Sequence, residues 1–223
     1  MKLFFKFFFL LLIFLHGAFG VRAQYATDTA STTVRPREFV IPAALMTSGL
    51  IVQGNISRQL QRQIINRYPS YATRADDFLA VTPAAFSLGL GAAGVKGKHP
   101  FGEQIILAIV SGVLAQGITT TFKVLSKYPR PDKDGFDSFA SGHTTAAFTG
   151  ATLLHQEYGH RSVWYSVGGY GVATSVATLR MLNNRHWLSD VLFGAGVGIG
   201  TTKAMYLLYP AVKRKVLEKR RKR

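Results

Sequence analysis

Three short stretches, far apart along the chain, carry cations, histidines and a carboxylate at spacings that suit phosphate chemistry. Each lies beside an apolar segment, where a charged residue is costly unless it has a function. Lys and Arg bind phosphate oxygens, and a histidine beside a carboxylate is a candidate nucleophile. The residues are Lys123 and Arg130 in the first stretch, Ser141, Gly142 and His143 in the second, and Arg180, His186 and Asp190 in the third.

The cations and the second stretch together predict a phosphate cradle that needs no metal. Lys123, Arg130 and Arg180 would gather three fixed positive charges, which is costly unless a polyanion lies among them. Ser141 and Gly142 open a predicted helix, where free backbone N–H groups and the helix dipole favour an anion. Gly142 has no side chain to block the approach of a phosphate.

The two histidines supply the groups that a phosphoryl transfer requires. His186 and Asp190 are four residues apart, so on a helix they share one face. A carboxylate bonded to one ring nitrogen fixes the tautomer and leaves the other nitrogen free to attack phosphorus. His143 follows the cradle directly and is placed to protonate the leaving oxygen.

Taken one at a time, these residues have simpler interpretations. Lys123 or Arg180 alone is a cation snorkelling at a helix end. His186 and Asp190 alone are a surface pair worth a few tenths of a kcal/mol, roughly. Ser141 and Gly142 alone are a helix start. The combination at fixed spacings in three blocks favours the functional interpretation.

The three stretches resemble the motifs K-x6-R-P, P-S-G-H and S-R-x5-H-x3-D of the type 2 phosphatidic acid phosphatase and vanadium haloperoxidase superfamily. Two flanking positions depart from the pattern: Ala140 stands where the family usually has Pro, and Leu179 where it has Ser. The resemblance covers roughly residues 76–209. It implies a helical bundle with His186 as nucleophile, Asp190 as its partner and His143 as acid. The remaining five site residues would bind the phosphate oxygens.

The elements that must position these residues are predicted to be helices, because no strand-like alternation of any length occurs. We expect an all-α polytopic bundle of about five to six membrane helices, with small residues that allow close packing. A further polar helix, with Ile56, Leu60 and Ile64 among arginines, should lie on a surface. A soluble bundle is the alternative. The apolar segments are Phe39–Val52, Leu79–Val95, Ile105–Phe122, Gly142–Leu154, Val163–Leu179 and Val191–Tyr209.

The chain divides into regions of different composition. Residues 1–23 have the layout of a secretory signal peptide or an uncleaved signal anchor, and 24–38 read as a linker. Residues 39–75 would enter the membrane and form the polar helix, and 76–209 would form the phosphatase domain. A basic tail, 210–223, follows the last apolar segment.

Composition excludes several classes of protein. Apolar residues make up 48% of the chain and charged residues 17%, which favours a membrane protein. With no cysteine, disulfide scaffolds, thiolate metal sites and cysteine nucleophiles are excluded. Much of the net charge of +16 lies in the C-terminal tail, and no basic run elsewhere has interleaved aromatics, so the charge indicates a membrane-side anchor and not a nucleic-acid binder.

Charge also predicts the orientation. If Phe39–Val52 dips into the membrane without crossing, then Lys96, Lys98, Arg161 and the tail lie in the cytoplasm, as the positive-inside rule requires. If that segment crosses, the orientation inverts. In the first case, without crossing, the three stretches meet at the periplasmic face of the inner membrane of a bacterium.

The sequence thus predicts a metal-independent phosphatase, without a cofactor, that hydrolyses a phosphorylated membrane lipid through a phosphohistidine. By resemblance, lipid A phosphate is the favoured substrate, with undecaprenyl diphosphate, phosphatidylglycerophosphate and phosphatidic acid as alternatives. A vanadium-dependent haloperoxidase and a non-catalytic membrane protein are the other classes considered. The oligomeric state is left open.

Overall fold

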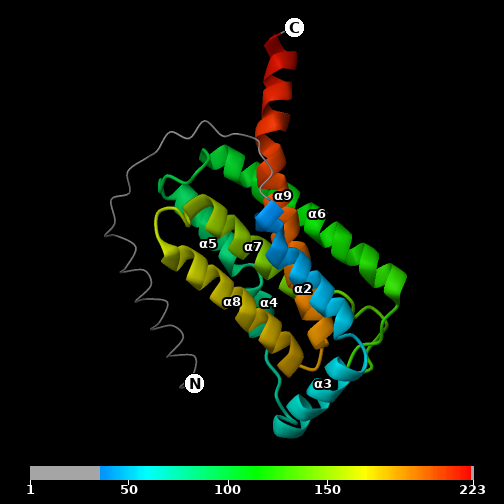
Figure 1. The fold of residues 1–223 in the computed structure, drawn as a ribbon. Helices are drawn as coiled ribbons and strands as arrows, with labels where there is room; N and C mark the ends of the chain where they lie inside the picture. The colour runs from blue at the N-terminus through cyan, green and yellow to red at the C-terminus, as the bar shows by residue number, and fades with distance from the viewer. Residues whose placement is uncertain (1–35, 222–223) are drawn as a thin grey trace.

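The computed structural model describes residues 36–221, and over that range every element of regular secondary structure is a helix (Figure 1). The all-α class is therefore confirmed. The predicted signal and all of the linker except its last three residues lie outside the described residues. In chain order the elements are η1 (Pro36–Phe39), α2 (Val40–Ile51), α3 (Asn55–Arg67), α4 (Ala75–Leu79), α5 (Thr82–Ala92), α6 (Phe101–Ser126), α7 (Gly142–Tyr158), α8 (Val163–Leu182) and α9 (Leu188–Arg221).

Helix α7 is the centre of the bundle and contacts α5, α6, α8 and α9. Most of its residues are buried, and many of them are Ala, Gly or Thr. Ala147 and Ala151 pack against Ala173 of α8, so the helices approach closely without large side chains. Thr152 donates to a backbone carbonyl, that of Phe148, at 2.7 Å, which satisfies its hydroxyl inside the bundle.

Helices α6 and α9 are long and apolar enough to cross a membrane. The outer face of α6 exposes large apolar side chains such as Ile109 and Val113, as a lipid-facing helix does. The α2–α3 pair, bent by 84°, adds at most one span by the same measure. The count of five to six spans is not confirmed, because central helices such as α7 are enclosed by protein and do not need an apolar surface.

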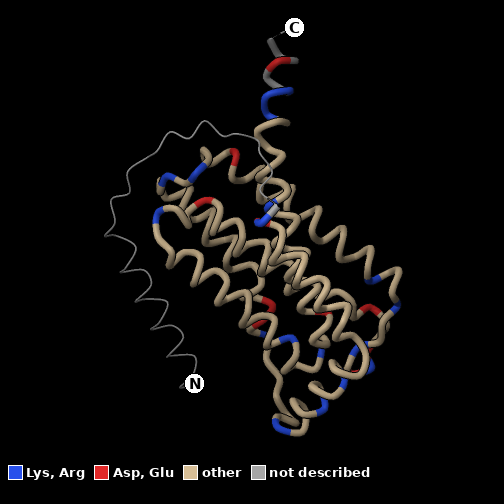
Figure 2. Tube along the Cα trace, in the orientation of Figure 1, with Lys and Arg blue, Asp and Glu red and all other residues tan. Residues whose placement is uncertain are grey.

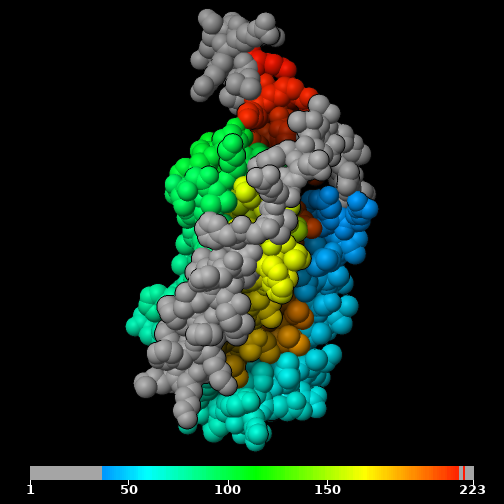
Figure 3. Space-filling view, turned by 90° about the vertical axis from the view of Figure 1, so that its left-hand side faces the viewer, coloured from blue at the N-terminus to red at the C-terminus, as the bar shows by residue number. Residues whose placement is uncertain are grey.

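Charged residues gather toward the two ends of the bundle, and the helices between them are largely uncharged (Figure 2). At one end, Arg161 Nη1 donates to the backbone oxygen of Lys96 at 2.6 Å, which joins two basic loops. Helix α9 continues from this end through Pro210, so the basic tail begins as a helical extension that projects beyond the body (Figures 1 and 3).

The segment expected as a helix over Leu79–Val95 holds a shorter helix, α5, and its first residue ends the separate short helix α4. Helix α4 ends at Leu79, and α5 begins at Thr82 with Pro83 in its first turn. Proline favours a new helix start there because it has no N–H to donate to the preceding turn. The break places the short α4, with its two aspartates, at the end of the bundle where the three motifs lie.

Helix α2 packs antiparallel to α9. It begins beside Lys203 and ends beside Ser189. Lys203 Nζ donates to the Glu38 backbone oxygen at 3.0 Å. A Cβ on Gly49 would lie 2.9 Å from the Ser189 oxygen, so this close approach requires glycine. Helix α3 then turns across the end of the bundle as the predicted surface helix (Figures 1 and 3).

Candidate active site

The three motif stretches lie at one end of the bundle, at the end of α6, the start of α7, the end of α8 and the start of α9. The backbone N–H of Ser141 donates to the backbone oxygen of Asp190 at 3.1 Å, which joins the second stretch to the third. A Cβ on Gly194 would lie 2.8 Å from the Ser141 oxygen. Glycine at this position therefore lets α9 approach α7 closely enough to join the two stretches.

His186 and Asp190 form the expected pair, with Nδ1 3.3 Å from Oδ2. Asp190 is fully buried, and its Oδ2 also accepts from Ser138 Oγ at 2.5 Å and from the Trp187 N–H at 3.0 Å. Ser189 Oγ donates to the other oxygen at 3.1 Å. Four donors hold this carboxylate in one orientation, and through it the ring of His186.

Burial lowers the pKa of His186 from its ordinary value to about 4, and the nearby Lys123 and Arg180 act in the same direction. The Asp190 carboxylate opposes this effect without overcoming it. The imidazole is therefore neutral at physiological pH. Its Nε2 has no hydrogen-bond partner within the described part of the chain, so it is available to a ligand.

Arg180 is buried and paired with a buried carboxylate that the sequence analysis did not single out. Its Nη1 donates to Asp76 Oδ2 at 2.6 Å, and Asn183 Nδ2 donates to Asp76 Oδ1 at 3.0 Å. The Nε of Arg180 is also buried but has no partner in residues 36–221. A buried guanidinium N–H without an acceptor is costly, so this atom marks a place for an anion.

Lys123 and Arg130 share a second unforeseen carboxylate, Asp137. Arg130 donates to both oxygens of Asp137, from Nε at 2.7 Å and from the terminal nitrogen at 2.9 Å. Lys123 Nζ donates to the Asp137 backbone oxygen and lies 4.0 Å from its carboxylate. The hydrogen bonds from Arg130 lower the pKa of Asp137, although half of this carboxylate remains exposed.

Ser141 caps α7, as predicted: its Oγ accepts from the Thr144 N–H at 3.5 Å and from the Thr144 hydroxyl at 3.0 Å. In the first turn of α7, His143 Nε2 lies 2.9 Å from Asp77 Oδ1. Arg180 lies within electrostatic range of both histidine rings. The eight predicted residues thus occupy one end of the fold, and Gly142 has open space where a Cβ would be, apart from Gln116 Oε1 at 3.4 Å.

The expectation that three cations require an external polyanion is wrong in its simple form. Asp76 and Asp137 neutralise much of that charge within the protein. Sequence reasoning missed Asp76 because Arg180 lies 104 positions away along the chain, and the local signal was the Asp76-Asp77 pair ahead of an apolar segment. Asp137 lies only seven residues from Arg130, but in a loop, where no helical period predicts a contact. Within the described ranges, no three His, Cys, Asp or Glu side chains are grouped as metal ligands.

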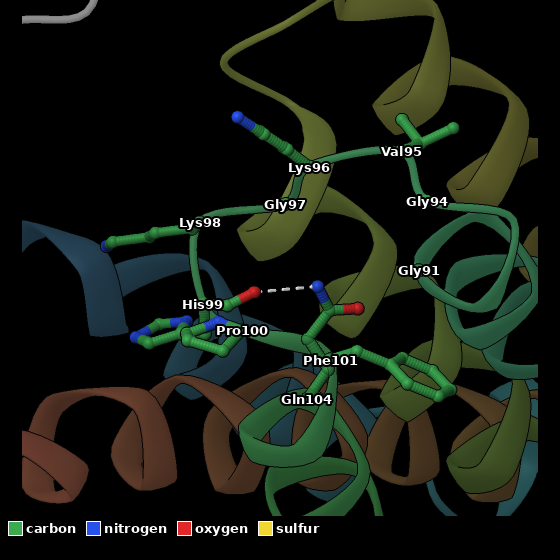
Figure 4. Close-up of a pocket in the computed structure, with 10 residues that line it drawn as sticks. All are labelled: Gly91, Gly94, Val95, Lys96, Gly97, Lys98, His99, Pro100, Phe101 and Gln104. Carbon is green, nitrogen blue, oxygen red and sulfur yellow. Dashed lines mark hydrogen bonds between the residues drawn. The ribbon is translucent and has the colours of Figure 1, made fainter.

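A hollow at the opposite end of the bundle holds none of the predicted site residues (Figure 4). It is lined by the loop before α6, and Gln104 Nε2 donates to the His99 backbone oxygen across it at 2.8 Å. The side chains of Lys96 and Lys98 extend away from Phe101 and Gln104. The hollow is therefore not a second phosphate cradle of the kind at the motif end.

Among known protein families, the PAP2 superfamily matches residues 104–214 of the chain. A lipid A 1-phosphatase from Porphyromonas gingivalis is 35% identical over 176 residues, which are 78% of this chain and 38% of that protein, so the chain spans well under half the length of this curated relative.

Two crystal structures are also similar to the chain. That of Aquifex aeolicus LpxE has 24% identity and a TM-score of 0.43, covering 70% of this chain and 98% of that one. That of a transmembrane PAP2-type phosphatidylglycerolphosphate phosphatase from Bacillus subtilis has 19% identity and a TM-score of 0.49, covering 78% and 98%.

The family match begins just inside α6 and extends into the projecting part of α9. It therefore contains all eight predicted site residues. Two helices long and apolar enough to cross a membrane, together with the bacterial relative, indicate a bacterial membrane protein. Motifs, helical architecture and family match agree: residues 104–214 of this chain form a PAP2 superfamily domain.

Proposed function

We propose that the chain is a metal-independent phosphatase that removes phosphate from a membrane lipid through a phosphohistidine intermediate. The proposal is carried by the neutral, buried His186, oriented by Asp190 and within electrostatic range of Arg180, whose Nε has no partner in the described residues. A nucleophile with a free nitrogen beside an unsatisfied cationic donor is the arrangement that attack on a bound phosphate requires.

In the proposed reaction the lone pair of His186 Nε2 attacks phosphorus, and the P–O bond to the lipid breaks. The leaving oxygen takes a proton from His143, whose charged form Asp77 stabilises at 2.9 Å. Water then attacks the phosphohistidine and gives a proton to His143. The P–N bond breaks, inorganic phosphate leaves, and both histidines return to their first state.

Lys123, Arg130, Arg180 and the backbone at Ser141 and Gly142 would bind the phosphate oxygens. Because Asp137 is half exposed and occupies Arg130, an incoming phosphate must displace it. Asp76 is buried and holds Arg180 from the side, so it stays in place. Charge stabilisation by these groups is the main contribution the protein makes to a phosphoryl transfer.

Among substrates we favour a lipid A phosphate, with undecaprenyl diphosphate, phosphatidylglycerophosphate and phosphatidic acid as alternatives. The support is the name of the 35% identical relative, a lipid A 1-phosphatase. The test is phosphate release by the purified chain from these four lipids and from a soluble phosphate ester. Highest kcat/KM on lipid A supports the proposal, and activity on the soluble ester alone would contradict a lipid substrate.

We assign the phosphatase unit to residues 76–209, which starts upstream of the span that matches the family. The reason is that α4 supplies Asp76 to Arg180 and Asp77 to His143. A chain that lacks α4 should therefore lose activity even though it keeps every motif. The regions assigned as signal, linker, membrane entry and basic tail flank this unit.

We also propose that the site faces the periplasm from the inner membrane. Because α2 runs from the Lys203 end of the bundle to the motif end, this orientation requires the start of α2 to lie on the cytoplasmic side, and the expectation that Phe39–Val52 dips in from outside does not fit it. The support is the gathering of Lys96, Lys98 and Arg161 at the opposite end, together with the basic extension of α9. The chain has no cysteine, so single-cysteine variants report position cleanly. In intact spheroplasts an impermeant maleimide should label Ser70→Cys and not Lys98→Cys; the reverse pattern would invert the orientation.

A further inference from the structure

An open groove lies at the motif end of the molecule, between α3 and the loops that carry the first and third motifs. Two arginines of α3 and an aromatic residue are among the side chains that line it: Arg58, Gln61, Arg62, Ile65, Asn66, Pro131, Asn184 and Trp187. We infer that this groove binds a second phosphate group, carried on the same lipid headgroup whose first phosphate is cleaved. This inference rests on the proposed phosphatase function.

Arg58 and Arg62 differ from the cations of the catalytic centre because they have no internal counter-charge. They are four residues apart, so they lie side by side on α3. Neither guanidinium has a hydrogen-bond or ion-pair partner in the described chain, and α3 contains no Asp or Glu. Two adjacent, unpaired guanidinium groups match the oxygens of a phosphate.

Helix α3 is fixed to the site and does not lie loosely on the membrane surface. Ser57 Oγ accepts from the Ser189 N–H at 3.1 Å, next to Asp190 in the sequence. Gln61 Nε2 donates to the Met181 backbone oxygen and to Asn184 Oδ1, both at 2.9 Å. The same helix turns that carry these buried anchors carry the arginines, so the groove keeps a set position relative to the catalytic histidine.

The groove adjoins the centre through residues next to two site residues. Pro131 follows Arg130, and Trp187 follows His186. Trp187 is itself held, since its Nε1 donates to the Pro129 backbone oxygen at 2.7 Å. A ligand in the groove therefore reaches toward the nucleophile, but its phosphate contacts different cations. Two separate cationic sites joined by a polar groove fit a headgroup with two phosphates.

The test compares a bisphosphorylated glucosamine disaccharide lipid with the same lipid that keeps only the phosphate to be cleaved. Both are assayed in neutral detergent micelles. Arg58→Gln/Arg62→Gln should lower kcat/KM on the first lipid by about 10- to 100-fold, mostly through KM, because charged hydrogen bonds are lost. The monophosphorylated lipid should change by less than about 2-fold. Arg67→Gln, an exposed arginine of α3 outside the groove, is the matched control.

Equal losses on both lipids would overturn the inference, as would a loss that occurs only when anionic phosphatidylglycerol is added to the micelles. The latter result would make α3 a membrane-surface contact. Binding of the bisphosphorylated lipid to His186→Ala, with and without the two arginine substitutions, tests the groove without turnover. If the unaltered chain hydrolyses neither lipid, the proposed function fails. The difference in lipid binding between His186→Ala with and without the arginine substitutions still shows whether the groove binds a phosphate.

Discussion

Two cationic regions lie at the same end of this molecule and differ in one respect. In the catalytic centre, Arg130 is paired with Asp137 and Arg180 with Asp76. In the α3 groove, Arg58 and Arg62 have no such partner in residues 36–221. A carboxylate partner fixes a guanidinium in position before substrate arrives. The charge of an unpaired guanidinium is not neutralised within the protein, so it can attract an external anion.

The centre itself contains both kinds of pairing. The Arg180–Asp76 pair is buried, and the Arg130–Asp137 pair is about half exposed on its acidic side. A buried pair is strongly destabilised when one partner is removed, whereas an exposed pair contributes little and exchanges readily. The buried pair should therefore act as scaffold and the exposed pair as a contact that substrate replaces.

Replacing the nucleophile should have the largest effect. His186→Ala removes the nitrogen that would attack phosphorus, so kcat should fall by at least about 10³-fold. Phosphate release from the preferred lipid measures this effect, with circular dichroism as a check on folding. His160→Ala, at an exposed position on the other end, is the control. Residual activity near the control level would mean that another residue is the nucleophile.

Breaking the buried pair should come next. Asp76→Asn keeps the shape of the side chain but leaves Arg180 without its counter-charge, at a cost of about 3–5 kcal/mol to the folded state. Activity should fall by about 10²-fold or more because Arg180 loses its position. Thermal unfolding in detergent and phosphate release measure the two effects. If both stay unchanged, Asp76 does not position Arg180.

The neighbouring aspartate should show a different signature. Asp77→Asn removes the carboxylate that favours the charged ring of His143, so activity should fall by about 10-fold. Because the acid must be protonated, the alkaline limb of the kcat/KM profile should move to lower pH. The full pH profiles of Asp76→Asn and Asp77→Asn distinguish the two variants. A loss of activity in Asp77→Asn without movement of the alkaline limb would give Asp77 a purely structural role.

The exposed pair should respond with the opposite sign. Asp137→Asn removes a carboxylate that competes with phosphate for Arg130, so KM should fall, by no more than about 5-fold because exposed pairs are weak. Initial rates over a range of lipid concentrations measure the change. A rise in KM would show that Asp137 helps to bind substrate, and the distinction between scaffold and replaceable contact would fail.

The smallest effect should come from mild acid. With a pKa of about 4, His186 stays about nine-tenths neutral at pH 5, so the nucleophile itself loses little between pH 7 and pH 5. The acid limb due to this residue should be centred near pH 4, below the ordinary histidine value of about 6.5. Single-turnover rates across this range measure where the acid limb is centred. An acid limb that is due to His186 and centred near pH 6.5 would contradict the lowered pKa.

The sequence predicted most of the helices because their signals are local. Apolar runs and the helix start at Ser141 act within one or two turns, and α8 begins at Val163 as expected. The start of the segment 79–95 was placed three residues too early, because no Gly or Pro before Pro83 marks the break between α4 and α5. The span count was not confirmed, because hydropathy describes a helix and not its neighbours.

What the sequence determined by itself was the set of chemical groups: cations, histidines and one aspartate at spacings that place them on helix ends. Only the tertiary structure decided which carboxylates hold them. Asp76 meets Arg180 across 104 positions, and Asp77 meets His143 across 66. Such pairs leave no periodic trace, because they form where helix ends happen to meet in the folded bundle, and that meeting depends on the packing of every helix between them.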